Sequence, residues 1–296
     1  MATLTLLCVV WGLTQVAIKL ANTGISPLCQ AGLRSAGSAL LLWGWSAARG
    51  VPLFRRDGSL GHGVVIALLF AAEFVFIYWG LVYTTASRAV LFVYLSPFVV
   101  ALGAHWFVPG ERLRPMTVAG LLCAFAGMAL AFADGLTLPT RRELLGDVME
   151  LAGAILWGAT TIVIKARRGL AISPSKTLFY QLVGSAAVLL PLSVATGERG
   201  VTDPSPLVLA ALAYQIVIVA FASYLTWFWL LSRYPASALA AFSFLTPLFG
   251  MAAGGLLLGE RITPALAAAM LLVAAGIYLV NRAPASAGRG DAGARR

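Results

Sequence analysis

Two ionisable residues, Arg34 and Glu73, lie within long apolar stretches that contain few other charged residues. Arg34 is seven residues into the stretch 27–48, and Glu73 is eleven residues into the stretch 62–83. At 1.5 Å per helical residue, these positions are about 10 Å and about 16 Å from opposite ends of a bilayer core about 30 Å thick. The two groups can therefore meet at similar depth.

A lone charge at such a depth costs at least about 3 kcal/mol, which favours pairing. We therefore expect Arg34 and Glu73 to form a structural pair. The alternative is that Glu73 exchanges protons or holds the amino group of a substrate.

A polar face recurs on two stretches that are far apart in the sequence. Positions i, i+3, i+4 and i+7 share one side of a helix. The two sets are Trp11, Thr14, Gln15 and Ile18, and Trp157, Thr160, Thr161 and Ile164. They could line a substrate path where the halves meet; alternatively, the tryptophans pack and the threonines bond to their own helices. Gln15 cannot satisfy its amide in that way.

Aromatic residues cluster in corresponding stretches and could line an apolar cavity with a few polar anchors. Those that we expect at such a cavity are Tyr78, Tyr94, Tyr214 and Phe244. The alternative for each ring is core packing or a place in the interfacial belt. Pro97 and Pro247 lie at equivalent mid-stretch positions and leave backbone carbonyls unbonded, which predicts a kink or a gate.

Enzyme and metal chemistry find little support in the sequence. The two histidines, His62 and His105, do not occur in an HExxH pattern, and the three cysteines have no metal-ligand spacing. We expect no catalytic residue, no metal and no cofactor.

The elements that must position these residues are membrane helices. Hydrophobic residues make up 60% of the chain and charged residues 11%, far from the roughly 25% charged residues of soluble proteins. A span needs about 20 apolar residues, and the chain offers ten such stretches. These are 3–20, 27–48, 62–83, 87–107, 115–133, 148–165, 175–195, 207–230, 236–258 and 263–281.

The stretches form two copies of one unit. Trp11-Gly12 and Lys19 return as Trp157-Gly158 and Lys165, and Leu95-Ser96-Pro97 returns as Leu245-Thr246-Pro247. Five spans per copy is an odd number, so the second copy must enter the membrane from the opposite side. The sequence thus predicts an all-α membrane protein of two inverted five-helix repeats, 1–140 and 141–282, followed by a disordered tail, 283–296.

Basic residues set the orientation. With the N-terminus in the cytoplasm, 14 Lys and Arg side chains lie inside and 6 lie outside, which favours cytoplasmic termini. The formal net charge of +10 then faces anionic lipid. We expect the lipid bilayer, and not nucleic acid, to be the charged partner.

Several motifs resemble those of the drug/metabolite transporter superfamily. They are Trp11-Gly12, Ser26-Pro27 with Arg34, Ser96-Pro97, and Gly-Glu-Arg at 110–112 and 259–261. Within it, the chain resembles bacterial exporters with two EamA-type repeats, and its length and aromatic content are similar to those of an aromatic amino acid exporter.

This resemblance implies a monomeric secondary transporter in the bacterial inner membrane. Inverted repeats, with a substrate bound between them and alternating access, are a recurrent plan of such proteins. The expected substrate is a neutral amino acid, aromatic or otherwise hydrophobic. The alternatives are transport of a nucleotide sugar or another organophosphate, and a passive channel.

Overall fold

The computed structural model describes residues 2–133, 138–166, 172–258 and 264–282. The predicted tail 283–296 and the side chain of Gln15 lie outside the described residues. Over the described ranges the chain is helical and forms no strand; its one β-type contact is an isolated bridge between Ile25 and Val201.

The first half contains six helices. They are α1 (Ala2–Ala21), α2 (Pro27–Ala48), α3 (Leu60–Tyr83), α4 (Ala86–Val93), α5 (Ser96–Phe107) and α6 (Pro115–Ala131). The second half repeats this order but divides its third span. Its elements are α7 (Arg141–Ala166), α8 (Pro174–Ala195), α9 (Pro206–Tyr214), the π-helix η2 (Gln215–Ser223), α10 (Tyr224–Leu231), α11 (Ala236–Phe242), α12 (Leu245–Leu258) and α13 (Pro264–Arg282).

These elements combine into ten spans in the described part of the chain, because α4 continues into α5, α9 into η2 and α10, and α11 into α12. Five are long and apolar enough to cross a membrane by length and composition: Leu60–Tyr83, Arg88–Phe107, Arg141–Ala166, Pro174–Ala195 and Pro206–Leu231. α2 is long enough but carries Arg34 and several hydroxyl and amide side chains. The prediction of an all-α protein with ten spans is confirmed.

Proline determines where many helices begin. Its fixed φ suits the first turn of a helix, where its missing N–H is not needed. The helices α2, α5, α6, α8 and α9 all have proline in that turn. Serine hydroxyls cap two of them: Ser173 accepts from the backbone N–H of Lys176, and Ser205 from that of Val208.

Spans four and nine are broken where the prolines predicted it. α4 ends at Val93 and α5 begins at Ser96, just before Pro97; α11 ends at Phe242 and α12 begins at Leu245, just before Pro247. A proline cannot donate to the carbonyl four residues earlier, so each span bends and restarts. Each span is thus interrupted at its proline, and the predicted kink or gate stays a prediction.

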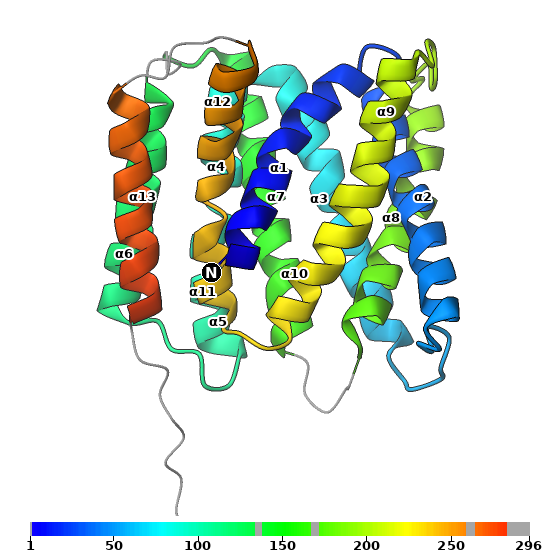
Figure 1. Cartoon of the computed structure of the whole chain (residues 1–296), viewed down its shortest axis with the longest axis horizontal. Helices are drawn as coiled ribbons and strands as arrows, with labels where there is room; N and C mark the ends of the chain where they lie inside the picture. The colour runs from blue at the N-terminus through cyan, green and yellow to red at the C-terminus, as the bar shows by residue number, and fades with distance from the viewer. Residues whose placement is uncertain (1, 134–137, 167–171, 259–263, 283–296) are drawn as a thin grey trace, which may run out of the picture.

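Glycines let the helices approach closely. A Cβ on Gly12 of α1 would lie 2.8 Å from the backbone of Gly250 in α12, and a Cβ on Gly276 of α13 would lie 2.5 Å from the carbonyl oxygen of Gly120 in α6. Small residues drive helix association in membranes because they allow dense packing. Figure 1 shows α6 beside α13 at one edge of the bundle and α2 beside α8 at the other.

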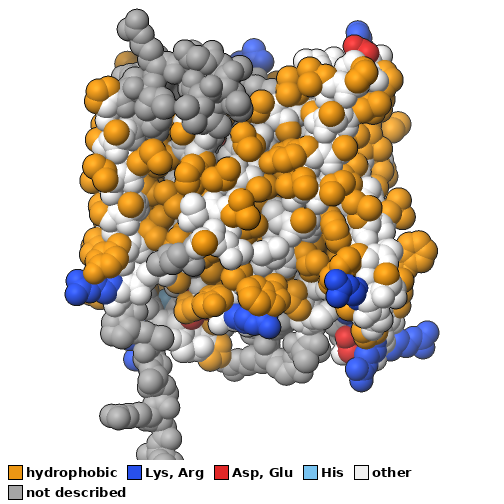
Figure 2. Space-filling model, in the orientation of Figure 1, with side chains coloured by type: hydrophobic (Ala, Val, Ile, Leu, Met, Phe, Trp, Pro, Cys, Tyr) orange, Lys and Arg blue, Asp and Glu red, His pale blue; other side chains and the backbone are white. Residues whose placement is uncertain are grey.

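The outer surface suits a bilayer. Figure 2 shows hydrophobic side chains over the middle of one face, with Lys and Arg side chains at its two ends. Exposed apolar residues such as Leu40, Trp43 and Leu68 belong to the long helices. In a bilayer these side chains contact the acyl chains of the lipid, so they do not form an apolar patch exposed to water.

Candidate functional site

A group of charged and aromatic side chains lies between α2, α3 and α10, and we call it the central cluster. Its members are Arg34, Phe70, Glu73, Phe74, Tyr78 and Tyr224. Arg34 is only 1% exposed and Glu73 only 6%. Arg34 acts electrostatically on the Glu73 carboxyl and on both tyrosines, so the group is compact.

Aromatic rings form the walls of the central cluster. The Arg34 guanidinium lies 4.2 Å from the centre of the Phe74 ring. Phe70 contacts Phe74 edge-on at 4.8 Å between centroids, and Tyr224 contacts Phe70 at 6.2 Å. A cation over an aromatic face is stabilised by about 0.5–2 kcal/mol, more when it is removed from water. This contact holds the guanidinium but uses none of its N–H groups.

The expected direct pair between Arg34 and Glu73 is not what the structure shows. Ion pairs in the described ranges join Arg88 to Asp147 and Lys176 to Asp57. Stacking on Phe74 takes the place of the ion pair. The central cluster therefore contains a buried cation and a buried acid that are near each other but not bonded.

Several polar atoms of the central cluster lack a hydrogen-bond partner among the described residues. They are Nε and Nη2 of Arg34, Oε2 of Glu73 and the hydroxyl oxygen of Tyr78. Buried polar groups are nearly always bonded, and leaving one unbonded costs about 1–3 kcal/mol. The central cluster therefore keeps donors and acceptors that no described residue satisfies.

The tryptophan face of α1 contacts span eight. The Trp11 indole N–H donates to the Ser223 hydroxyl at 2.8 Å, and its ring meets Trp227 and Tyr224 at 5.4 and 6.4 Å between centroids. Through Tyr224 this face adjoins the central cluster. Thr14 instead donates to the carbonyl of Val10 in its own helix, at 2.9 Å.

The corresponding face of α7 belongs to a different aromatic group. Trp157 meets Tyr94 edge-on at 6.0 Å, and Thr161 donates to the carbonyl of Trp157 at 3.1 Å. Phe244 is 0% exposed and contacts the rings of Phe98 and Phe125. In this conformation these rings are core packing.

Tyr214 and the π-helix join span eight to α1. The Tyr214 hydroxyl donates to the carbonyl of Val10 at 3.0 Å, and the Gln215 amide donates to that of Ala17 at 3.3 Å. On the other side, the Ser38 hydroxyl of α2 donates to the carbonyl of Ile216 at 2.9 Å. Long π-helices are rare and often occur at functional sites.

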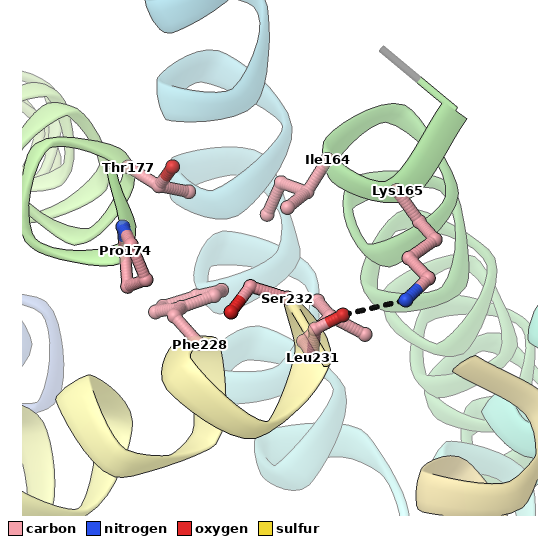
Figure 3. Close-up of a pocket in the computed structure, with 7 residues that line it drawn as sticks. All are labelled: Ile164, Lys165, Pro174, Thr177, Phe228, Leu231 and Ser232. Carbon is pink, nitrogen blue, oxygen red and sulfur yellow. Dashed lines mark hydrogen bonds between the residues drawn. The ribbon is translucent and has the colours of Figure 1, made fainter. Parts of the chain in front are cut away.

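A separate small pocket lies between the ends of α7, α8 and α10 (Figure 3). Its volume is about 180 Å³, below the roughly 300–1,000 Å³ of drug-sized ligand sites. The Lys165 amine donates to the carbonyls of Leu231 and Tyr234, at 2.7 and 2.6 Å, and so neutralises the end of α10. Phe228, which lines the pocket, lies one turn after Tyr224 in α10.

Sequence reasoning missed a second buried group of charges, which we call the Arg88 cluster: Thr84, Arg88 and Asp147. The Arg88 Nε donates to both Asp147 oxygens at 3.1 Å, and the Thr84 hydroxyl donates to Oδ1 at 2.7 Å. One turn further along α7, Glu150 is fully buried. Both acids lie at the edge of the stretch 148–165, where the sequence alone indicates only a helix end.

A further missed contact lies in the loop after α2. The Lys176 amine donates to both oxygens of Asp57 at 2.8 Å and to the carbonyl of Arg55 at 2.7 Å. The bond from Lys176, helped by one from the Ser59 backbone N–H, holds the pKa of Asp57 well below its usual range. This contact ties the loop to the start of α8.

Glu111 gives the repeated Gly-Glu-Arg motif a structural role. Its carboxylate accepts from the backbone N–H groups of Ala236 and Ser237, at 2.9 and 3.3 Å. A carboxylate at a helix N-terminus satisfies free N–H groups and the helix dipole. Glu111 therefore joins the end of span four to the beginning of span nine; its counterpart, Glu260, lies outside the described residues.

Comparison with known proteins finds the same architecture elsewhere. The EamA-like transporter family matches residues 1–133 and 144–282. A probable amino-acid metabolite efflux pump of Escherichia coli is 28% identical over 285 residues, covering 93% of this chain and 92% of that protein. An uncharacterized transporter of Archaeoglobus fulgidus is 26% identical over 284 residues, covering 94% of this chain and 96% of that protein. A solved crystal structure superposes with a TM-score of 0.80 at 20% identity, covering 93% of this chain and 94% of that one.

Proposed function

Because the chain belongs to the EamA-like transporter family, we propose that it exports neutral amino acids with aromatic or other hydrophobic side chains across the bacterial inner membrane. The chain is a multi-pass membrane transporter and not an enzyme. One observation supports this substrate class: Arg34 and Glu73 lie among the aromatic rings of the central cluster without an ion-pair partner.

The chemistry of the central cluster matches a zwitterion. A free amino acid brings a carboxylate, an ammonium group and a side chain. Arg34 offers N–H groups in the fork geometry that suits a carboxylate, and Glu73 can accept from an ammonium group. The rings of Phe70, Phe74 and Tyr224 supply an apolar surface for the side chain. Two buried charges without partners are costly, and a zwitterion satisfies both at once.

An organophosphate fits the central cluster less well. A phosphate monoester carries close to two negative charges at neutral pH, whereas the cluster holds one cation and one acid. Glu73 would repel such a substrate. The Escherichia coli relative is named as a probable amino-acid metabolite efflux pump, which supports the same substrate class.

Alternating access between inverted repeats, 1–140 and 141–282, completes the proposal. Equivalent spans make equivalent contacts: α3 packs on α7 as span eight packs on α1, and α5 packs on α7 as α12 packs on α1. Both halves break their fourth span at the same motif. These features support two halves that rock about a shared axis. The excess of Lys and Arg on one side supports the placement of both termini in the cytoplasm.

Transport by purified protein in proteoliposomes tests the substrate. We expect uptake of labelled phenylalanine and leucine, competition by other neutral amino acids and none by nucleotide sugars. Glu73→Gln keeps shape but removes the charge, and we expect it to fold normally and to lose most transport. Movement of phosphorylated compounds without amino acid transport would overturn the proposal.

Cysteine labelling in a variant without Cys8, Cys29 and Cys123 tests topology and mechanism. Ala2 and Ala294 should label from the cytoplasm and Thr140 from outside. Cysteines at Tyr94 and Phe244 should change accessibility in opposite directions when a substrate gradient biases the conformation. Simultaneous labelling of both from both sides would indicate a channel.

A further inference from the structure

Glu150 of α7 is an acid without a visible partner. It is 0% exposed, and in the described part of the chain it is the one buried carboxylate whose two oxygens both lack a hydrogen bond. Asp147, one turn away, is bonded to Arg88 and Thr84. Asp147 and Glu150 are both buried in the same helix, yet only Asp147 is bonded. Burial by itself therefore does not explain why Glu150 has no hydrogen bond.

The carboxyl of Glu150 rests against a glycine of α3. A Cβ on Gly80 would lie 2.7 Å from Oε1 and 2.9 Å from the carboxyl carbon, so the absence of a side chain at Gly80 makes the space for this group. A Cβ on Gly146 of α7 would likewise lie 2.9 Å from the Gly80 carbonyl oxygen. The α3–α7 interface is therefore shaped around a carboxyl group.

The charged groups around Glu150 do not favour its ionised form. On its own helix the nearest is Asp147, which repels a second negative charge, with Glu143 further out. On α4, Arg88 is bonded to Asp147. On α3 the nearest acid, Glu73, is seven residues from Gly80, about 10 Å along the helix. An isolated buried carboxylate is strongly disfavoured, whereas the neutral acid fits this space.

We propose that Glu150 is the proton-binding site that couples export to the proton gradient. When the α3–α7 interface opens to one side, a carboxylate oxygen of Glu150 takes a proton from water. When the interface opens to the other side, the O–H bond breaks and the proton leaves to water there. One proton moves inward for each substrate that moves outward. This inference rests on the proposed function.

α3 supplies the physical link between the two sites. It carries Glu73 of the central cluster and Gly80, the wall of the Glu150 site. A substrate that binds to Glu73 therefore acts on α3, and the position of α3 opens or closes the Glu150 site. The repeat offset of 146 places Leu4 at the position equivalent to Glu150. The first half therefore has no acid equivalent to Glu150.

Wild-type protein gives the first test. Dicyclohexylcarbodiimide is apolar and modifies protonated carboxyls in apolar surroundings, and mass spectrometry locates the modified residue. We expect modification of Glu150 that declines as the pH is raised and when phenylalanine is saturating. Absence of modification at Glu150, or modification indifferent to pH, would overturn the proposal without reference to any transport assay.

The second test uses proteoliposomes with the membrane potential clamped to zero. With one proton exchanged per substrate, an interior one pH unit more acidic than the medium supports about tenfold accumulation of phenylalanine. We expect Glu150→Gln to lose this accumulation but to keep exchange of internal for external phenylalanine. The matched control is Glu143→Gln, a partly exposed acid in the first turn of the same helix, and it should accumulate normally.

The outcomes separate the two proposals. Transport by wild type that ignores the pH gradient, or a Glu150→Gln protein that still accumulates, rejects Glu150 and leaves the amino acid exporter intact. No amino acid movement under any gradient rejects the proposed function, and the carbodiimide labelling still decides whether Glu150 holds a proton. If Glu150→Gln folds poorly, Glu150→Asp keeps the titratable group and should keep accumulation.

Discussion

The Arg88 cluster and the central cluster each bury one arginine and one acid, yet they are built differently. Arg88 and Asp147 bond through two nitrogens, and Thr84 adds a hydroxyl. Arg34 and Glu73 are equally buried but unbonded, and an aromatic ring lies against the guanidinium. The first arrangement fastens α4 to α7, whereas the second keeps its hydrogen-bonding groups available to a ligand.

Position in the helices explains the difference. Arg88 lies at the beginning of α4, directly after the end of α3, and Asp147 lies in the second turn of α7, so the two side chains meet near helix ends and bond. Arg34 and Glu73 lie in the middle of α2 and α3, where Phe70, Phe74 and Tyr224 occupy the space around them. The comparison predicts that the two clusters respond oppositely to loss of charge.

Removal of Asp147 should have the largest effect on stability. Asp147→Ala leaves Arg88 buried without its acid and should lower the free energy of unfolding by about 3–5 kcal/mol. Denaturant unfolding in detergent measures the loss, and Arg88→Met with Asp147→Leu should recover much of it. An Asp147→Ala protein as stable as the parent would remove the contrast between the clusters.

Removal of Arg34 should affect transport instead. Arg34→Met deletes a buried charge that has no bonded acid, so the unfolding free energy should stay the same or rise. Loss of a charge-assisted contact to the substrate carboxylate costs at least about 2 kcal/mol, or about 30-fold in transport efficiency per folded molecule. If Arg34→Met instead unfolds like Asp147→Ala while its folded fraction transports normally, Arg34 is a scaffold residue.

A substitution between uncharged residues measures the effect of helix packing alone and so sharpens the comparison. Gly12→Ala places a methyl group 2.8 Å from backbone atoms of Gly250 and Thr246, so α1 and α12 must separate. Overpacking of this kind costs about 1–3 kcal/mol, and thermal unfolding measures it. Gly44→Ala, where no atom lies within 4 Å, is the control and should be at least as stable as the parent.

The ion pair of Asp57 and Lys176 should give the smallest effect, because Asp57 is accessible to solvent. Its pKa is lowered in the folded protein, so its stabilising contribution is present above the unfolded value of about 3.9 and is lost as the pH falls through the folded value. Asp57→Asn should therefore melt slightly earlier than the parent at pH 7. The difference should shrink at high salt and vanish in strong acid.

The membrane spans could be predicted from the sequence because the features that determine them are local. Apolar runs of membrane length and prolines in the first turn are visible in the chain, and Pro97 and Pro247 marked both breaks correctly. α7 begins at Arg141, earlier than the predicted stretch 148–165, and so includes Asp147, whose charge the neighbouring helices bury. Apolar composition could not indicate this.

The candidate site was only partly predictable. Arg34 and Glu73 were found because charges in apolar runs are rare, but stacking of Arg34 on Phe74 depends on how α2 meets α3. Thr14 and Thr161 bond to their own helices, as the simpler interpretation held. The space for Glu150 depends on Gly80, seventy residues earlier in the chain, and no local pattern connects the two.

The π-helix η2 gives span eight a tolerance for changes in length. Deleting one residue from an α-helix turns everything beyond it by about 100°. A π-helix has wider turns, closed by i→i+5 bonds, so η2 can lose an exposed residue such as Val217 by tightening into an α-helix. Tyr224 and Trp227 then keep their direction. The same deletion at the exposed Phe76 of α3 has no wide turn to absorb it and would misdirect Tyr78, which the folded yields of the two deletions can measure.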